Sequence, residues 1–321
     1  MPYDMLDKVK VAVIGDFCLD VYWYADMTKS VLSRETPHFP LPVQREKMSP
    51  GGAGNVAANI TALDVEKVYA IGVIGDDWRG ECLRGTLAQS NVDTSALCVC
   101  KNRFTNTYIK PMKYGYSGEC AEQARLDFEG ESAIDEQTEK QILAVLEEVA
   151  LKVDVICVCD QMKFGCITEK VREKICTLGA SGKTVFVDSR DRIALYKNVI
   201  IKPNDIEASR AVDGKVEDAC TNAEKLSAIT GRNTIVTCGE NGCVVCENGK
   251  VSEIPAFIRE GEIDFCGAGD TFLSALAAFT AGGFSLCDAA RFANAASSVT
   301  VHKVGTTGTA SRKEIFSVCG E

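Results

Sequence analysis

Short apolar runs alternate along this chain with segments of helical periodicity. The apolar runs predict strands at 10–15, 68–75, 153–159, 184–188, 199–202 and 234–237. Helices are expected at 138–151, 169–179, 205–211 and 219–230. Strands that are apolar throughout are typical of a parallel sheet that is covered on both faces. The sequence therefore predicts an α/β fold with a mostly parallel central sheet, and with ligand-binding groups at the carboxyl ends of its strands.

Two stretches interrupt this alternation, at about 21–48 and 103–118. The first begins with Tyr22, Trp23 and Tyr24 and continues into a polar segment that contains prolines. We expect the two stretches to form a small β lid on a single domain that spans residues 1–321. The aromatic side chains of the lid either form its core or face a ligand, and the sequence leaves both possibilities open.

Composition excludes several classes of function. The net charge of −10 argues against nucleic acid as a partner, because phosphate backbones require a positive surface. No apolar run approaches the roughly 18 residues of a membrane span, and the first residues are polar, so we expect a cytoplasmic protein without membrane contact. The sixteen cysteines are interpreted as buried thiols, because only two histidines and no second Cys pair of matching spacing support a zinc site.

The segment from Asp264 to Thr271 combines a small-residue turn with the start of an apolar helix. Unpaired N–H groups of Gly267, Ala268 and Gly269 at such a helix end can bind an anion. Asp270 follows directly and would repel a phosphate, so it suits the role of general base for an attacking hydroxyl. The alternative is that Asp270 is only an acid in the first turn of a helix, where the dipole favours it.

Three further segments have the composition of ligand-binding turns. Gly51 and Gly52 precede a small-residue helix and allow a ligand to approach the backbone, with Asn55 near enough to offer an amide. Asn204 and Glu207 follow a strand and share one face of a helical turn, and their oxygens suit hydrated Mg²⁺. The fourth segment is a tight turn after a strand and contains Thr237, Gly239 and Gly242.

These four segments, in this order, resemble the ribokinase-like (PfkB) carbohydrate kinase family over nearly the whole chain. The resemblance implies a three-layer α/β/α sandwich with a β lid, and an ATP-dependent sugar kinase that requires Mg²⁺. It assigns Asp270 as catalytic base, with Gly267, Ala268 and Gly269 as the anion hole. It places Asn204 and Glu207 at magnesium through water, and it adds K⁺ near Asp264 as in some members. The residues assigned to the nucleotide are Asn204, Glu207, Thr237, Gly239, Gly242 and Asn294.

Within this family the motifs are most similar to those of bacterial heptose-7-phosphate kinases. The similar residues are Gly15-Asp16, Leu19-Asp20, Tyr22-Trp23-Tyr24, Pro50 to Ala53, Arg125 to Glu129, and Gly305-Thr306. Val21, Gln161 and Phe265-Cys266 depart from the pattern of that group. The resemblance implies a sugar or sugar phosphate as acceptor, with heptose 7-phosphate at O1 as one candidate. The substrate-binding residues that it implies are Asp16, Asp20, Gly51, Gly52, Asn55, Arg125 and Asp127.

Two other functions stay open on the sequence. One is a kinase for another sugar or for a nucleoside, and the other is a ligand-binding relative that has lost catalysis. If the acceptor carries a phosphate, it needs a cation, and Arg34, Arg125, Arg190 and Arg192 are the candidates. Exposed edges and apolar faces of a projecting lid are usually covered by a partner, so we also expect a homodimer formed through the lid.

Overall fold

The computed structural model describes residues 2–212, 218–305 and 307–320. The α-helices are α1 Ala53–Thr61, α2 Trp78–Gln89, α3 Glu136–Ala150, α4 Glu169–Ala180, α5 Asp205–Val212, α6 Ala219–Thr230, α7 Ala268–Ala281, α8 Leu286–Thr300 and α9 Arg312–Cys319. The strands are β1 Lys10–Gly15, β2 Phe17–Asp26, β3 Val43–Gly52, β4 Lys67–Gly75, β5 Val92–Asp93, β6 Leu97–Cys100, β7 Thr107–Tyr114, β8 Cys120–Glu122, β9 Leu126–Phe128, β10 Val155–Asp160, β11 Thr184–Ser189, β12 Ile200–Ile201, β13 Thr234–Thr237, β14 Cys243–Glu247 and β15 Lys250–Ile254. Short 3-10 helices lie at Pro2–Leu6, Met27–Lys29, Ile193–Leu195 and Gly239–Asn241.

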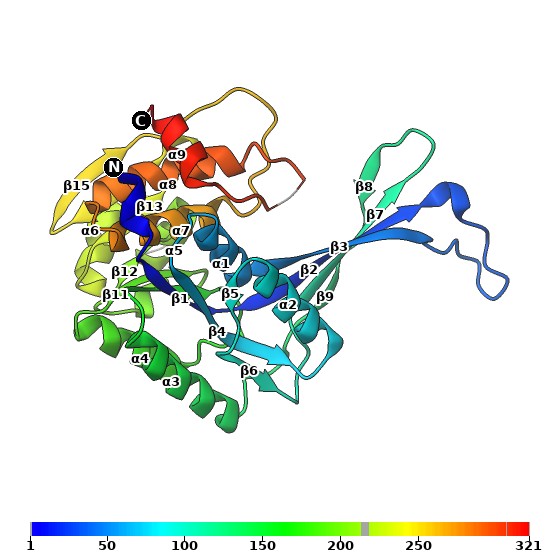
Figure 1. Ribbon diagram of the computed structural model, residues 1–321, viewed down its shortest axis with the longest axis horizontal. Helices are drawn as coiled ribbons and strands as arrows, with labels where there is room; N and C mark the ends of the chain where they lie inside the picture. The colour runs from blue at the N-terminus through cyan, green and yellow to red at the C-terminus, as the bar shows by residue number, and fades with distance from the viewer. Residues whose placement is uncertain (1, 213–217, 306, 321) are drawn as a thin grey trace.

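One large sheet forms the centre of the molecule, with the order β15-β14-β13-β12-β11-β10-β1-β4-β5 and with β6 also paired to β4 (Figure 1). Its strands pair in parallel except for β14 and β15, which form an antiparallel edge. The β14–β15 turn contains Asn248 and Gly249, both at positive φ, as an Asn-Gly hairpin requires. The predicted mostly parallel sheet is thus confirmed.

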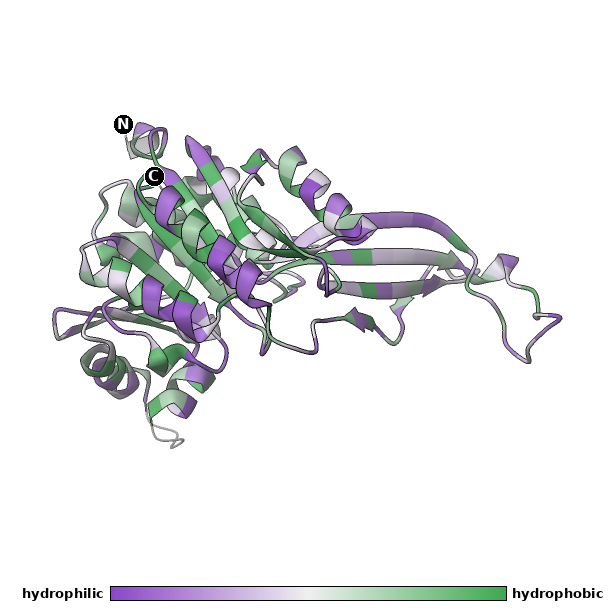
Figure 2. Ribbon diagram, turned by 90° about the horizontal axis from the view of Figure 1, so that it is seen from below, coloured by the Kyte–Doolittle hydropathy of each residue, from purple (hydrophilic) through white to green (hydrophobic). Residues whose placement is uncertain are grey.

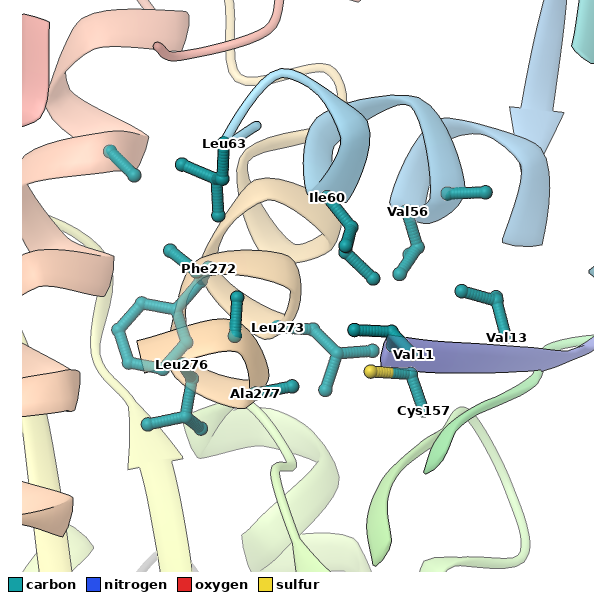
Figure 3. Packing of buried hydrophobic residues seen from close by; sticks show 14 of the residues in the cluster. Val11, Val13, Val56, Ile60, Leu63, Cys157, Phe272, Leu273, Leu276 and Ala277 are labelled. Carbon is teal, nitrogen blue, oxygen red and sulfur yellow. The ribbon is translucent and has the colours of Figure 1, made fainter. Parts of the chain in front are cut away.

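Alternate residues of each central strand enter two separate cores. Val11 and Val13 of β1 belong to a core with α1, α7, α8 and α9, whereas Ala12 and Ile14 belong to a core with α3, α4 and α6. Figure 3 shows the first of these, where side chains of α1 and α7 meet β1. Because successive side chains on a strand point to opposite faces, helices must cover both sides of the sheet. This arrangement confirms the predicted three-layer α/β/α sandwich.

A second sheet, with the order β3-β2-β7-β8 and with β9 also paired to β7, projects from the central body (Figure 1). We call this sheet the lid. Where the lid joins the body it is apolar, since Phe17, Leu19 and Val21 are fully buried. Farther out its strands are largely hydrophilic (Figure 2), and the first five residues of β3 are exposed.

The lid extends farther along the chain than the predicted stretches 21–48 and 103–118. Its strands occupy 17–26 and 43–52 in the first part, and 107–114, 120–122 and 126–128 in the second. The additional strands β8 and β9 have only three residues each and are mostly exposed, so they carry no apolar alternation by which a strand is recognised.

No helix among the described residues is long and apolar enough to cross a membrane. All sixteen cysteines are free thiols. Most of them are buried or half-buried, and only Cys120 and Cys266 are exposed, which agrees with their interpretation as small core residues.

Candidate active site

The carboxyl ends of β1, β10 and β11 face the N-terminus of α7, where Asp270 lies in the first turn. Gly267 caps this helix at φ 80°, a conformation that favours glycine. A Cβ at Gly267 would lie 2.6 Å from Nδ2 of Asn55. Glycine at this position therefore allows the turn to pack directly against α1.

Asn55 Nδ2 donates a hydrogen bond of 2.7 Å to Oδ2 of Asp270. The side-chain amide of Asn59 fixes the orientation of the Asn55 amide, because Asn59 Nδ2 donates to Oδ1 of Asn55 at 3.2 Å. Thr271 Oγ1 in turn donates to Oδ1 of Asn59 at 3.1 Å. Since Asn55 and Asn59 are buried, this chain of hydrogen bonds holds the Asp270 carboxylate in a defined position.

Burial raises the pKa of Asp270 to about 6, and the charges of Asp188 and Asp20 act in the same direction. The Asn55 hydrogen bond and the charge of Lys202 oppose this rise. At neutral pH the carboxylate is therefore ionised, and its pKa is close enough to 7 for efficient proton transfer. These are the properties required of a general base.

The first turn of α7 offers N–H groups for an anion, because the first N–H groups of a helix lack intrahelical partners. One of the three predicted donors is engaged, since the Ala268 N–H donates to the Phe265 carbonyl at 3.2 Å. The N–H groups of Gly269 and Asp270 belong to the same turn. The anion site at this turn, with Gly267 and Gly269 as donors, stays a prediction.

Lys202 is a site residue that the sequence analysis missed. It is 3% exposed, and its Nζ lies 2.9 Å from Oδ2 of Asp188. A Cβ on Gly269 would lie 3.9 Å from the same Nζ, which places the ammonium beside the anion site. A buried lysine next to a helix N-terminus adds positive charge where phosphate oxygens would bind.

Asp20 lies on β2 and is buried, and burial raises its pKa, whereas the charges of Lys110 and Arg125 lower it. A Cβ on Gly51 of β3 would lie only 2.7 Å from Asp20 Oδ2, so glycine is required beside this carboxylate. Gly52 has φ 55°, and a Cβ added to it would lie similarly close to the Asp16 carbonyl oxygen. The two glycines therefore leave space around Asp20 and allow the chain to enter α1.

Asp16, expected as a sugar ligand, is held by backbone N–H groups in this structure. Its Oδ2 accepts hydrogen bonds from the N–H groups of Gln161 (2.9 Å) and Met162 (2.7 Å), and its Oδ1 accepts one from Cys166 (2.9 Å). Both oxygens are thus used to hold the loop after β10. Sequence reasoning could not find these contacts, because they join residues about 150 positions apart.

Arg125 and Asp127 form a bidentate ion pair with distances of 2.6 and 2.7 Å. Both side chains are well exposed, at 45% and 38%, and an exposed pair of this kind contributes about 0–1 kcal/mol. The Arg125 guanidinium also stacks on the ring of Tyr108 at 4.4 Å from its centroid. Tyr108 is the β7 neighbour of Asp20, so Arg125 lies on the same side of the lid as Asp20.

Asn204 and Glu207 bind each other across the start of α5. The Asn204 N–H donates to Glu207 Oε2 at 2.9 Å, and the Glu207 N–H donates to Asn204 Oδ1 at 2.8 Å. Such reciprocal bonds are a capping box, which the Asn-x-x-Glu pattern could have indicated. Burial raises the pKa of Glu207, and the nearby Asp188 carboxylate raises it further.

These oxygens fit a magnesium ion that keeps most of its water. Mg²⁺ in kinase sites takes one or two carboxylates together with water and substrate phosphates. Glu207 and Asp188 supply two desolvated carboxylates, and Asn204 supplies an amide oxygen. Among the described residues there is no cluster of three His, Cys, Asp or Glu side chains that could hold a metal directly. The donor set therefore favours contact through water.

The residues expected at the nucleotide form a turn beside α5. Thr237 pairs with Asn204 in an isolated parallel bridge, and Gly239 and Gly242 both have positive φ. A cavity of about 730 Å³ opens next to this turn, with Asp205, Cys238 and Asn241 in its wall. Thr237 and Asn204 are thus brought together as expected.

Asn294 and Asp264 both hydrogen-bond to neighbouring backbone groups, and their predicted roles at the nucleotide and at K⁺ stay predictions. Asn294 Nδ2 donates to the carbonyls of Ile254 (3.1 Å) and Pro255 (3.2 Å), so it anchors the end of β15 to α8. Asp264 accepts hydrogen bonds from the N–H groups of Cys266 (3.0 Å) and Gly305 (3.1 Å), and those bonds lower its pKa. Both side chains connect neighbouring segments in this structure.

A desolvated carboxylate, a helix N-terminus and a β lid on an α/β sandwich form an arrangement that suits phosphoryl transfer to a hydroxyl group. A family model described as "pfkB family carbohydrate kinase" matches residues 8–313. The chain therefore belongs to the pfkB carbohydrate kinase family.

Individual relatives and solved structures agree with this assignment. The bifunctional protein HldE of Nitratiruptor sp. is 34% identical over 313 residues, which cover 96% of this chain and 64% of the relative. HldE of Gluconacetobacter diazotrophicus is 31% identical, with 93% and 61% covered. The chain thus spans less than two thirds of the length of these relatives.

The fold is similar to that of Escherichia coli phosphofructokinase-2 in complex with substrates and products, with a TM-score of 0.73, 20% identity and 98% of both chains covered. It is also similar to ribokinase from Thermotoga maritima, with a TM-score of 0.70, 18% identity, and 98% and 100% covered. At these identities the likeness shows the fold.

Proposed function

We propose that this protein transfers the γ-phosphoryl group of ATP to a hydroxyl of a sugar phosphate, with Asp270 as the general base. The observation that carries the proposal is the hydrogen-bonded chain from Asn59 through Asn55 to Asp270, which orients a carboxylate of suitable pKa beside a helix N-terminus. A base in this position takes the proton of the acceptor hydroxyl while the N–H groups of α7 stabilise the transferring phosphoryl.

The other groups have supporting roles in this proposal. Lys202 and the first turn of α7 neutralise charge on the phosphates, and Asn204 and Glu207 hold the waters of Mg²⁺. The turn from Thr237 to Gly242 lies by the nucleotide. Magnesium supplies charge neutralisation between the nucleotide phosphates. Dependence on K⁺ near Asp264 stays a prediction.

Asp20 is the proposed ligand of the acceptor hydroxyls, because a carboxylate accepts two hydrogen bonds and this one is buried on the lid. Heptose 7-phosphate, phosphorylated at O1, is the first acceptor to test. The support for it is the similarity of two segments, 15–24 and 125–129, to heptose-7-phosphate kinases. The structure places both segments partly in the lid, on β2 and β9.

An assay of ATP hydrolysis and phosphoryl transfer with a panel of acceptors tests this proposal. The panel contains heptose 7-phosphate, fructose 6-phosphate, fructose, ribose and adenosine. We expect the highest kcat/KM for a phosphorylated sugar. A tenfold preference for a free sugar or for adenosine would reject the sugar-phosphate acceptor and keep the kinase. If the protein binds ATP but transfers its phosphoryl group to none of these acceptors, the result would favour a ligand-binding relative.

A further inference from the structure

Carboxylates surround the position of the acceptor. The charges of Asp20 and Asp188 raise the pKa of Asp270, and Asp20, Asp270 and Asp16 together raise that of Cys18, which lies among them. A sugar phosphate carries up to two negative charges of its own. Because like charges in a desolvated site repel strongly, an acceptor of this kind requires a cation on the sugar side.

The four arginines expected to supply this cation are engaged or exposed elsewhere. Arg192 binds Asp160 and the carbonyls of Met162 and Lys163, so it stabilises the loop after β10. Arg125 is already paired with Asp127. Arg34 is exposed in the loop between β2 and β3. Arg190 is exposed too, and its charge lowers the pKa of Glu207, which places it on the nucleotide side.

Lys110 on β7 provides the cation that is required on the sugar side. It pairs in register with Tyr22, which is two residues along β2 from Asp20. Its Nζ lies 3.6 Å from Oδ1 of Asp20 and donates to the Tyr22 hydroxyl at 3.0 Å. The side chain is only 17% exposed. Its ammonium is thus held next to the proposed hydroxyl ligand.

The same ammonium faces the loop that leads into α7. Backbone hydrogen bonds lower the pKa of Asp264 and burial raises that of Cys266, and in both cases the charge of Lys110 acts to lower the pKa. Lys110 therefore lies on the lid surface that is turned toward the catalytic helix. An ammonium has three N–H donors; Tyr22 accepts one and Asp20 pairs with the same nitrogen, which leaves one donor for a phosphate oxygen.

We propose that Lys110 is the specificity-determining residue that binds the phosphate group of the acceptor. The inference rests on the proposed function, since it assumes a phosphorylated sugar. In this arrangement Asp20 selects the hydroxyls, and Lys110 beside it selects the anionic group. The mutual neutralisation of the two side chains keeps both charged before the substrate binds.

The test compares Lys110→Gln with the wild type on heptose 7-phosphate and on the same heptose without phosphate. Loss of hydrogen bonds to a charged group should lower kcat/KM for the phosphorylated sugar by about 10- to 100-fold, mainly through KM. The value for the unphosphorylated heptose should change much less. Lys110→Arg keeps the charge and should restore part of the preference.

Lys113→Gln is the matched control. Lys113 lies on the same strand three residues farther on, so its side chain points to the opposite face of the lid. The Lys113→Gln variant should show the same preference in kcat/KM for the phosphorylated heptose as the wild type. Unfolding midpoints of all variants show whether each one folds.

An equal fall in kcat/KM for both heptoses would overturn the proposal, because Lys110 would then only position Asp20. A wild type that prefers unphosphorylated sugars would overturn the sugar-phosphate function itself, and the Lys110 proposal with it. The two failures are distinguishable, because the first appears only in the variant and the second already in the wild type.

Discussion

The body and the lid of this protein are built on different interactions. In the body, Asp270 lies at the start of a helix in which nine consecutive residues, from Thr271 to Phe279, are buried. In the lid, polar contacts prevail outside the base, such as the 2.6 Å hydrogen bond from Trp23 Nε1 to Glu46 and the stacking of Arg45 on Tyr24 at 3.9 Å. The comparison suggests a division of labour, in which the rigid part holds the reacting groups and the exposed part selects the acceptor.

Replacing Asp270 tests most directly whether the body holds the reacting groups. Asp270→Asn keeps the size of the side chain but removes the proton acceptor, so kcat should fall by roughly 10² to 10⁴ while ATP binding is nearly retained. Rapid-quench or coupled assays measure kcat, and calorimetry measures ATP binding. Asp135→Asn is the control, because it alters a surface helix cap that asparagine also fills. A D270N variant with more than half of the wild-type kcat would refute the assignment.

Leucine truncations compare the stability of the two regions. Leu273→Ala removes a fully buried side chain between α7 and β1 and should lower the free energy of unfolding by about 2–5 kcal/mol. Leu126→Ala on β9 of the lid removes a side chain that is 45% exposed, and its effect should stay near 0.5 kcal/mol. Urea denaturation measures both. Equal losses would show that the lid is as strongly packed as the body.

The pH dependence of kcat sharpens the assignment of Asp270. Because its pKa is raised to about 6, activity should rise as pH increases through 6, where the carboxylate loses its proton. Asn55→Leu removes the hydrogen bond that lowers this pKa, so the rise should move to higher pH. The variant should therefore lose more activity at pH 6 than at pH 8. If the pH profile of the N55L variant keeps the wild-type midpoint, the result would show that Asn55 does not control the pKa of Asp270.

The lid should also form a homodimer through its exposed residues. Val31 and Leu32, in the loop between β2 and β3, are 76% and 53% exposed. Replacing both with Asp should weaken a lid-mediated dimer. Leu151→Asp is the control, since Leu151 is 89% exposed at the end of α3 in the body. Light scattering at micromolar concentration measures the mass, and a strictly monomeric wild type would contradict the prediction.

The architecture could be predicted from the sequence because its signals are local. Apolar strands such as β10 and β11, the Asn248-Gly249 hairpin and the Gly-Ala-Gly-Asp turn each occupy a few consecutive residues. Their order fixes a parallel sheet, and such a sheet gathers the turns at one edge. Asp270 and Asn55 could therefore be assigned to one site before their 2.7 Å contact was seen.

The remaining site residues depend on contacts between distant segments. Lys110 lies in an alternating lid strand and Lys202 directly follows the short strand β12, and neither position marks a ligand. Lys202 becomes a candidate only because Asp188 and α7 lie beside it. Asp16 was assigned to the sugar from the family resemblance alone, and its hydrogen bonds to the loop after β10 could not be read from the sequence.

The junction between body and lid has a mechanical consequence. Only Asp16 separates the end of β1 from the start of β2, and the close approach of Gly15 to the Cys159 carbonyl leaves no space for a Cβ there. A rotation about a fixed point displaces each atom in proportion to its distance from that point. Because Asp20 is four residues from the junction and the loop at 27–42 is more than ten, the outer lid must travel much farther than the hydroxyl ligand does. If the lid rotates about this junction, a wide swing of its outer part would thus be a fine adjustment of Asp20 against Asp270.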